Sequence, residues 1–507
     1  MSDTKESLKE AELAKSSVSG DNVSSSNVDT AWKFLDANRD VAEATASESE
    51  LKALRRKIDW HIVPIMFCCY TMQFLDKVIL NYAAVMGIHA ELKLQGNDFS
   101  NIATFLFVAL LCFEVPNIYC LQKVPAAKWL GCNVILWGVA TASGAAAHNY
   151  QTLLVSRVFL GIFEATIAPS LLLISSQWYT KSEAAPRFSF WYLGLGLGQI
   201  IGGAVSYGFQ HVSKNAALSG WRIMFVVLGC LTITIGLWTF FFLPDTPMKA
   251  RWLSSEEKVK LLKHVSVNQT GIENRKFRPK EIFEALMDPQ LYLLLLAVIL
   301  LSVSSGVVTT YSATLIKNIV NDPKRAALMN MPSGAVSIFF TLFVGFAIRS
   351  QSHRWLWIIC CIIPAIIGGA LMSFLPTTNK AGVLAGIYLV NAVVAPLAVF
   401  YNWTSANFGG ATKRAFAAAL LSGSFSIGNI IGPQTFQARD APEYRPAKIA
   451  VMGTQAGCAL VTFILFLYYV WQNKKRGAIQ ENEDEYLSPE VWANMTDREN
   501  KKFRYSY

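Results

Sequence analysis

Charged side chains are scarce in this chain. Asp, Glu, Lys and Arg make up 16% of its 507 residues, and 53% are hydrophobic. A soluble domain carries about 25% charged residues, so the deficit points to a chain that lies in lipid. The nine cysteines show neither metal-ligand spacing nor an extracellular disulfide pattern. All of them fall in or at the edge of apolar segments, so we expect them to be packing residues and expect no metal site.

Further absences narrow the function. The first 50 residues are polar, Ser-rich and acidic, and they lack the basic-then-apolar start of a signal peptide. No histidine lies in the middle of an apolar segment, which argues against a histidine proton relay. The sequence offers no nucleophile–base arrangement and no cofactor motif. We therefore expect neither an enzyme nor a cofactor other than a proton as coupling ion.

Long apolar segments dominate what is present. A membrane-spanning helix needs about 20 mostly apolar residues, and twelve segments fit this requirement. They lie at residues 60–83, 99–121, 129–147, 151–176, 186–208, 221–243, 289–312, 330–348, 354–375, 381–403, 414–437 and 447–471. The pattern predicts an all-α polytopic membrane protein with twelve transmembrane helices.

The net charge of +10 would suit a nucleic-acid partner, but the placement of Lys and Arg argues against one. With the N-terminus inside, roughly 24 basic residues fall on the inner side and roughly 10 on the outer side, the bias that orients membrane proteins. Lys413, just before the eleventh span, is one of the inner residues. We predict a multi-pass protein of the plasma membrane with both termini in the cytoplasm.

A polar stretch divides the spans six and six. We expect a disordered and basic N-terminal region at 1–58, an N-terminal six-helix bundle at 59–243, a cytoplasmic central loop at 244–288, a C-terminal six-helix bundle at 289–473 and a cytoplasmic, mostly disordered tail at 474–507. In the central loop, Ser254 or Ser255 before two glutamates predicts a helix start. Residues 281–287 are expected to form a second short helix.

The two halves repeat two patterns. LGQIIGG at 197–203 in the fifth span returns as IGNIIGP at 427–433 in the eleventh. EATIAP, which begins at Glu164, returns as NAVVAP, which begins at Asn391. Because the two offsets nearly agree, they favour duplicated, pseudo-symmetric bundles, an architecture that places a substrate site near the midplane between the halves.

Polar residues in the first span fall on one helical face. Gln73, Lys77 and Asn81 stand at i, i+4 and i+8, while Asp76 points about 100° away from Lys77. A lysine facing a cavity can hold an anionic group as a compact point charge. We interpret Gln73, Lys77 and Asn81 as substrate-binding candidates. The alternative is that Asp76 or Glu164 neutralises Lys77 for assembly alone.

The fourth span carries Arg157 and Glu164, seven residues apart on one face. An ionisable residue at bilayer depth costs several kcal/mol unless it meets a partner, water or a ligand. The guanidinium of Arg157 can hold a carboxylate with two parallel hydrogen bonds, although a structural pair with Glu164 or snorkelling to the interface stays open. Glu164 is the leading proton carrier, because burial and nearby cations change carboxylate protonation in opposite directions.

Three weaker candidates complete the set. Asp76 and Glu114 are assigned to proton coupling with Glu164, although Glu114 stands close enough to Pro116 to hydrogen-bond the backbone that this proline frees. Asn391 joins the substrate-binding candidates because it mirrors Glu164. Interhelical hydrogen bonding is the commoner role for such amides.

At these residues the chain resembles the allantoate permease family of fungal anion:cation symporters, within the major facilitator superfamily. The matching stretches are Leu75–Gly87, Arg157–Ser170, Gly220–Gly229, Phe242–Lys258, Asn330–Ala335, Thr412–Lys448 and Asn494–Tyr505. The resemblance implies two six-helix bundles, alternating access and proton-coupled uptake of small organic anions such as allantoate, ureido acids, dipeptides or vitamin carboxylates. It also assigns the family's first-span cation to Lys77 and its fourth-span Arg and Glu to Arg157 and Glu164.

The chain departs from the family's pattern at three places. The loop LQKVPAAKWLG between the second and third spans lacks the usual acidic residue, GHTK is replaced by GGATKR, and Thr166 stands where a glycine is usual. Thr166 lies next to Glu164, so the substrate is left open. Our leading hypothesis is a monomeric, proton-coupled importer of a small organic anion. An exporter of a carboxylated metabolite with the same fold, or a non-transporting nutrient sensor, are the alternatives.

Overall fold

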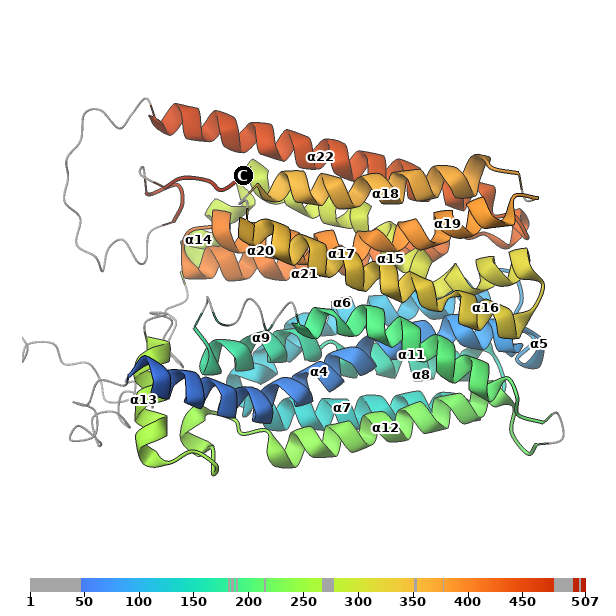
Figure 1. The fold of residues 1–507 in the computed structure, drawn as a ribbon, viewed down its shortest axis with the longest axis horizontal. Helices are drawn as coiled ribbons and strands as arrows, with labels where there is room; N and C mark the ends of the chain where they lie inside the picture. Colours follow the sequence, from blue (N-terminus) through green and yellow to red (C-terminus); the bar gives the residue numbers. More distant parts are fainter. Residues whose placement is uncertain are drawn as a thin grey trace, which may run out of the picture.

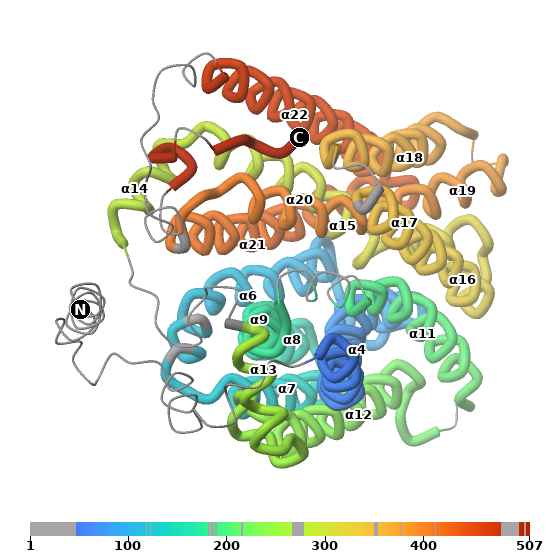
Figure 2. Tube along the Cα trace, turned by 60° about the vertical axis from the view of Figure 1, so that its left-hand side comes forward, coloured from blue at the N-terminus to red at the C-terminus, as the bar shows by residue number. Residues whose placement is uncertain are grey.

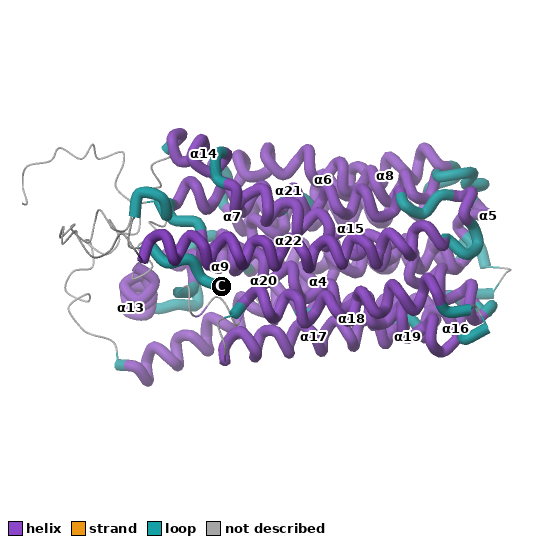
Figure 3. Tube along the Cα trace, turned by 90° about the horizontal axis from the view of Figure 1, so that it is seen from above, coloured by secondary structure: helices purple, strands orange, loops and turns teal. Residues whose placement is uncertain are grey.

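The computed structural model describes residues 47–507 apart from 181–182, 184–186, 188–189, 214–215, 267–277, 351–352, 377, 478–495 and 501–502. The predicted N-terminal disorder falls mostly on residues outside this range. Within the described residues every regular element is a helix. The long helices run side by side along the longest axis of the molecule (Figure 3).

The first six membrane helices form the N-terminal bundle, the lower half of Figure 1. Its members are α4 (Glu48–Met86), α6 (Asp98–Lys123), α7 (Ala126–Ser143), the pair α8 (Tyr150–Glu164) and α9 (Ile167–Trp178), α11 (Gly194–Phe209) and α12 (Gly220–Phe242). Helix α4 begins at Glu48, so the boundary expected at residues 58 and 59 lies inside this helix. Ser47 caps α4 through a reciprocal capping box with Glu50, which satisfies backbone donors at the helix start.

The remaining helices form the C-terminal bundle, which is the upper group of helices in Figure 2. Its members are α15 (Pro289–Val320), α16 (Pro323–Met329) with α17 (Met331–Ser350), α18 (Arg354–Phe374), the pair α19 (Lys380–Val390) and α20 (Val394–Asn407), α21 (Ala411–Gln434) and α22 (Arg445–Gly477). Among the described residues, eleven helices are long and apolar enough to cross a membrane. Helix α11, with 16 described residues, takes the fifth place, and the expected fold of twelve helices is confirmed.

The outer surface of both bundles is apolar. Phe241, Phe242 and Phe346 are 68%, 70% and 70% exposed. A helix that is apolar on its exposed face as well as its buried face belongs in lipid. In lipid the backbone must satisfy its own hydrogen bonds, which is why helices account for the whole of the described fold.

The two bundles carry a matching interruption. Helix α8 ends at Glu164 and α9 starts at Ile167, while α19 ends at Val390 and the short 3₁₀ helix η3 (Asn391–Val393) leads into α20. The break therefore falls at Glu164 in one bundle and at Asn391 in the other. These are the two positions that the sequence repeat aligns, so the repeat and the pseudo-symmetry of the halves agree.

The central loop forms two short helices at one end of the molecule. They are α13 (Ser255–Ser266) and α14 (Pro279–Leu286), close to the two expected helix starts. Helix α13 is fastened to α4 by an ion pair of 2.8 Å between Lys57 and Glu257. We call this the α13 end. The opposite end, which holds α5 (Ile88–Glu91) and α16, is the α16 end (Figure 1).

Hydrogen bonds join the two bundles toward the α16 end. The amide of Asn97 donates to Gln437 at 2.8 Å, and the hydroxyls of Ser100 and Tyr311 lie 2.5 Å apart. Two glycines allow α11 and α17 to approach closely, because a Cβ at Gly334 would lie 2.4 Å from the carbonyl oxygen of Gly196. Small residues at crossing points are the usual basis of tight helix packing in membranes. The bundles are thus sealed against each other at this end.

Substituting Gly334→Leu should open this seal. Overpacking costs about 1–3 kcal/mol, which corresponds to about a 5- to 150-fold shift in an equilibrium. The measurement is oxidative cross-linking between cysteines placed at Asn97 and Gln437, in a background without the native cysteines. Cross-linking should slow at least fivefold. Gly345→Leu on the same helix is the control, since a Cβ added at Gly345 would meet no atom within 4 Å; equal cross-linking in both variants would contradict the prediction.

Candidate functional site

An ion pair between Lys77 and Glu164 lies in the middle of the N-terminal bundle. Lys77 Nζ is 2.7 Å from Glu164 Oε1, and the Glu164 side chain is fully buried. Gln73 donates its amide to the same oxygen at 3.0 Å. Helix α4 supplies Gln73 and Lys77, and the break between α8 and α9 supplies Glu164. The structure therefore brings together three of the predicted site residues.

Arg157 reaches inward rather than toward a membrane surface. It is 1% exposed, and its Nη1 donates to the backbone carbonyl of Asp76 at 3.1 Å. The guanidinium lies over the ring of Phe225, 5.0 Å from the ring centre. The snorkelling alternative does not fit this position. The carboxylate of Asp76 accepts a hydrogen bond from Thr141 at 3.3 Å, so Asp76 faces α7 rather than Lys77.

Two aromatic rings flank the ammonium group of Lys77. Its Nζ lies 5.8 Å from the ring centre of Phe107 and 5.9 Å from that of Phe425. Phe107 belongs to α6 and Phe425 to α21, so the rings come from opposite bundles. The ring centres are 6.4 Å apart in an edge-to-face arrangement, a favourable geometry for both rings and for a nearby cation. The cation thus sits where the two bundles meet.

A narrow cavity touches this site. Its volume of about 10 Å³ leaves room for roughly one water molecule. The lining residues are Lys77, Leu80, Ile102, Ala103, Leu106, Phe107, Arg157, Thr309 and Thr310. Lys77 and Arg157 share the cavity with the two threonines of α15, which lie across the bundle boundary. Both predicted anion-binding cations therefore face the same space between the bundles.

Several polar atoms in this region lack a hydrogen-bond partner among the described residues. They are Glu164 Oε2, Asp76 Oδ1, and Nε and Nη2 of Arg157. A buried polar group without a partner is costly and calls for water or a ligand. The formal charges of Lys77, Arg157, Asp76 and Glu164 sum to zero. A proton on either carboxylate would therefore leave one positive charge to be matched.

Asn81 and Asn391 make contacts of a different kind. Asn81 donates to Ser312 at 2.9 Å and accepts from the backbone N–H of Ala313 at 3.1 Å, so it ties α4 to α15. Asn391 is fully buried and donates to the carbonyl of Ile387 at 2.9 Å within its own helix turn. Its Oδ1 has no partner among the described residues. In this state neither amide contacts the Lys77–Glu164 pair.

Glu114 stands apart from the charged cluster. It is 8% exposed on α6 and makes no ion pair with any residue that the structure describes. Its surroundings include Ser422 of α21, so it too faces the opposite bundle. The sequence grouped Glu114 with Glu164 as a proton-coupling residue, and the structure places the two carboxylates in separate environments.

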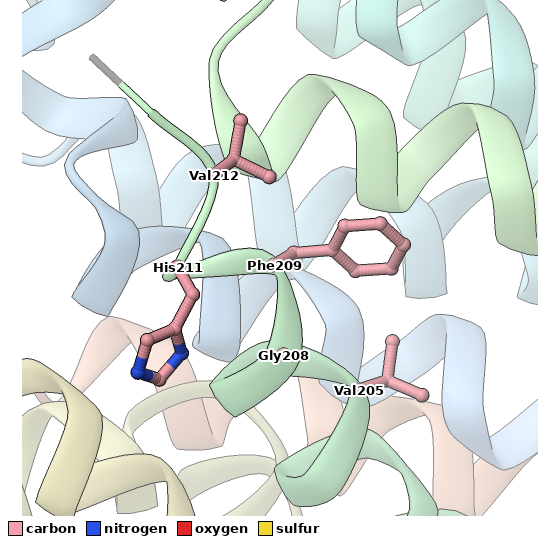
Figure 4. Close-up of a pocket in the computed structure, with 5 residues that line it drawn as sticks. All are labelled: Val205, Gly208, Phe209, His211 and Val212. Atoms are coloured by element: carbon pink, nitrogen blue, oxygen red, sulfur yellow. The ribbon is translucent and has the colours of Figure 1, made fainter.

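A wider hollow lies at the α16 end of the molecule. It measures about 430 Å³ and is lined by Val205, Gly208, Phe209, His211 and Val212 at the α16 end of α11. Figure 4 shows His211 pointing away from the apolar side chains of Phe209 and Val205. The His211 ring is exposed and lies 2.9 Å from the carbonyl of Tyr207. This surface has no convergent polar groups, and we assign no site to it.

Sequence reasoning missed a further buried cation. Lys413 was counted among the basic residues of the inner surface, yet its side chain is 0% exposed. It pairs with Glu284, Asp288 and Asp497 at 2.9, 3.0 and 2.7 Å. No local pattern marks this cluster, because its members come from α14, the start of α15, α21 and the last residues of the chain.

Comparison with known proteins agrees with the fold. The family model described as Major Facilitator Superfamily matches residues 66–433. The chain is 35% identical to the thiamine pathway transporter THI73 of Saccharomyces cerevisiae, over 98% of each chain. It is 31% identical to the allantoate permease of the same yeast, over 95% of this chain and 91% of the permease.

Solved structures share the fold at low sequence identity. A bacterial homologue of the human lysosomal transporter Spinster, in an inward-facing and occupied conformation, matches with a TM-score of 0.59 at 17% identity, over 80% of this chain and 96% of that one. The xylose transporter XylE of E. coli, in a partially occluded inward-open conformation, gives a TM-score of 0.60 at 16% identity, over 80% and 97%. At such identities the likeness supports the fold alone.

Removing Lys77 should expose the energetic role of the pair. Lys77→Met leaves Glu164 without its cation, a change that costs about 3–5 kcal/mol while the carboxylate stays ionised. The melting temperature of Lys77→Met should therefore fall by several degrees. Lys77→Met combined with Glu164→Gln should recover most of the loss. Thermal unfolding of the purified protein in detergent provides the measurement.

The matched control is Lys57→Met, which removes the part-exposed pair with Glu257. A surface pair contributes about 0–1 kcal/mol, so the melting temperature should change little. If Lys77→Met lowered the melting temperature no more than Lys57→Met, the buried pair would have no energetic importance.

Proposed function

This chain belongs to the major facilitator superfamily, within the fungal allantoate permease family, and on that premise we propose that it imports a small organic anion together with a proton by alternating access. It is a multi-pass membrane transporter and not an enzyme. The proposal has three parts, namely selectivity for an anion, coupling to a proton, and transport of the anion into the cell. Each follows from the arrangement of a few buried charges at the boundary between the bundles.

The ion pair of Lys77 and Glu164 carries the proposal. Lys77 Nζ and Glu164 Oε1 are 2.7 Å apart. While Glu164 is ionised, it therefore competes with an anionic substrate for the ammonium group of Lys77. A proton on Glu164 ends the attraction and frees Lys77. The carboxylate of a substrate then takes the place of the Glu164 carboxylate. Proton and anion thus bind together, because the proton removes the negative charge of Glu164 and the anion then neutralises the positive charge left on Lys77.

Arg157 supplies the second cation for the substrate. Its Nε and Nη2 have no partner among the described residues, and it lines the same narrow cavity as Lys77. A guanidinium edge can hold a carboxylate through two parallel hydrogen bonds. Gln73 donates to Glu164 and is available to a substrate once Glu164 turns away. Asn81 and Asn391 complete the proposed binding set as the bundles move.

Movement of the bundles would open this cavity. Phe107 and Phe425 cover Lys77 from opposite bundles, so rocking one bundle against the other separates the two rings. The hydrogen-bonded seal at the α16 end corresponds, in the proposed orientation, to a closed outer side. The α13 end and both termini then face the cytoplasm of a fungal cell, with the protein in its plasma membrane. A single chain contains the complete pathway, which fits a monomer.

The proton gradient would set the direction of transport. An acidic exterior protonates Glu164 and favours loading of the anion outside. The less acidic cytoplasm takes the proton back, and the restored Lys77–Glu164 pair expels the anion. Asp76 and Glu114 are the secondary candidates for proton coupling. Glu114 lies on the bundle boundary near Ser422, where a released proton could be passed on.

The names of the relatives bear on the substrate. An allantoate permease at 31% identity supports a ureido acid or a related carboxylate, and two buried cations suit such an anion. The relative at 35% identity is named for the thiamine pathway, so thiamine-related compounds belong among the test substrates. A cationic ligand would meet Lys77 and Arg157 at close range, and we therefore favour an anion.

Uptake of labelled carboxylates should depend on the proton gradient. In a strain without its own acid permeases, accumulation at about pH 5 should exceed that at about pH 7, and a protonophore should abolish the difference. Equal uptake under all conditions would reject coupling. Efflux from preloaded cells without uptake would favour the exporter alternative. Binding of a substrate without movement in either direction would favour the sensor.

The variant Glu164→Gln should separate exchange from accumulation. An amide cannot take up a proton and leaves Lys77 free, so substrate exchange persists while uphill accumulation falls at least tenfold. Glu256→Gln is the matched control, because it makes the same change at an exposed carboxylate of α13, outside the proposed pathway. Accumulation should stay within about twofold of the unmodified protein. Undiminished accumulation in Glu164→Gln would remove Glu164 from the proton role.

A further inference from the structure

The last residues of the chain fold back into the C-terminal bundle. Asp497 is fully buried and lies 2.7 Å from Lys413 Nζ. It also accepts a hydrogen bond from the backbone N–H of Gly409 at 3.2 Å and one from the hydroxyl of Tyr505 at 2.8 Å. The expectation of a disordered tail is therefore wrong for Thr496–Asn500 and for Phe503–Tyr507. Residues 478–495, which connect them to α22, lie outside the described residues.

The final residues bind α20 and the start of α18. Ser506 exchanges two hydrogen bonds with Asn407, whose amide donates to the Ser506 carbonyl at 3.0 Å and accepts from the Ser506 backbone N–H at 2.8 Å. The indole of Trp403 donates to the same carbonyl at 2.8 Å. The carbonyl of Tyr507 accepts from the backbone N–H of Arg354 at 2.7 Å. Main-chain groups of the segment therefore form hydrogen bonds with side chains of α20 and with the backbone at the start of α18.

A third group of contacts holds the segment to α22. Asn473 donates to the carbonyl of Tyr505 at 2.9 Å and accepts from its backbone N–H at 2.9 Å. Arg476 donates to the carbonyl of Phe503 at 2.9 Å and to the Tyr505 hydroxyl at 3.0 Å. Figure 1 places the C-terminus between α22 and α20.

The groove that receives this segment has the features of a specific peptide site. A Cβ at Gly409 would lie 2.3 Å from the backbone nitrogen of Asp497, so the turn between α20 and α21 needs a glycine there. Burial, and then the charge of Asp497, hold the pKa of Tyr505 well above its usual range, so its hydroxyl stays a donor. The buried charges and the hydrogen bonds to the main chain of the segment favour one docked arrangement.

Lys413 keeps two carboxylate partners when the segment is absent. Lys413 would still pair with Glu284 and Asp288, at 2.9 and 3.0 Å. The cation would not be stranded, which is the event that makes the loss of one partner from a buried pair so destabilising. The bundle can therefore exist with the segment docked or undocked.

We propose that this groove is a peptide-binding site for the chain's own C-terminal segment, residues 496–507, and that its occupation is required for transport. The segment joins α14, α15, α18, α20, α21 and α22 at the α13 end. It holds the turn between α20 and α21. Alternating access requires each bundle to turn as one body, and the docked segment fastens helix ends that lie at the moving edge.

Peptide binding tests the site without knowledge of the substrate. The transporter ending at residue 495 is purified in detergent and titrated with a fluorescent peptide of residues 496–507, with anisotropy as the readout. Binding should be saturable and should weaken at least tenfold for a peptide with Asp497→Asn. A peptide with Glu499→Gln is the control, because Glu499 is exposed and bonds only within the segment, to the Thr496 backbone N–H. Equal affinity of both altered peptides, or no binding, would overturn the proposal.

Transport by the full chain tests the requirement. Full-length Asp497→Asn keeps two carboxylates on Lys413 and should fold, but uptake should fall at least fivefold and protease should cut the C-terminus faster. Glu499→Gln should match the unmodified protein in both assays. The chain ending at residue 495 should lose uptake and regain it when the peptide is enclosed in proteoliposomes. Full uptake by the truncated chain without peptide would show that the segment is dispensable.

Discussion

The buried pair of Lys77 and Glu164 is the interaction on which this structure depends. Two charges taken out of water cost several kcal/mol each, and only close pairing with further hydrogen bonds offsets that loss. Here the offset comes from a 2.7 Å contact and from the Gln73 amide. The Glu164 carboxylate is held by both an ammonium group and an amide, so the pair ties α4 to the end of α8 inside the N-terminal bundle.

The two bundles are alike in backbone and unlike in charge. Both interrupt the same helix, at Glu164 and at Asn391, so each has a position near the midplane where a side chain leaves the regular helix. The N-terminal bundle places a carboxylate there and the C-terminal bundle a neutral amide. Across the boundary, α15 and α21 contribute Thr309, Thr310 and Phe425 rather than charges. At this site the N-terminal bundle therefore supplies the charged groups, and the C-terminal bundle supplies neutral side chains.

Different interactions stabilise the two ends of the molecule. At the α16 end, glycines and amides let the bundles touch each other directly, and such contacts can part without leaving a buried charge. At the α13 end, the strongest interactions lie within each bundle rather than between them. Helix α13 is fastened to α4 by ion pairs, and the C-terminal segment is fastened around Lys413. At the α13 end, these ion pairs therefore stabilise each bundle separately and do not join the two bundles.

The sequence by itself determined the class of the protein and the number of membrane helices, because hydropathy is a local property. Helical spacing likewise placed Arg157 and Glu164 on one helical face. It also aligned Glu164 with Asn391, since an internal repeat is visible without coordinates. Only the tertiary structure decided which oxygen pairs with Lys77, that Arg157 binds the carbonyl of Asp76, and that Phe425 covers the cation. The cluster of Lys413 with Asp497 lay beyond sequence reasoning for the same reason. Its partners are separated by up to 213 residues, from Glu284 to Asp497, and only packing of the helices brings such distant charges within hydrogen-bonding distance.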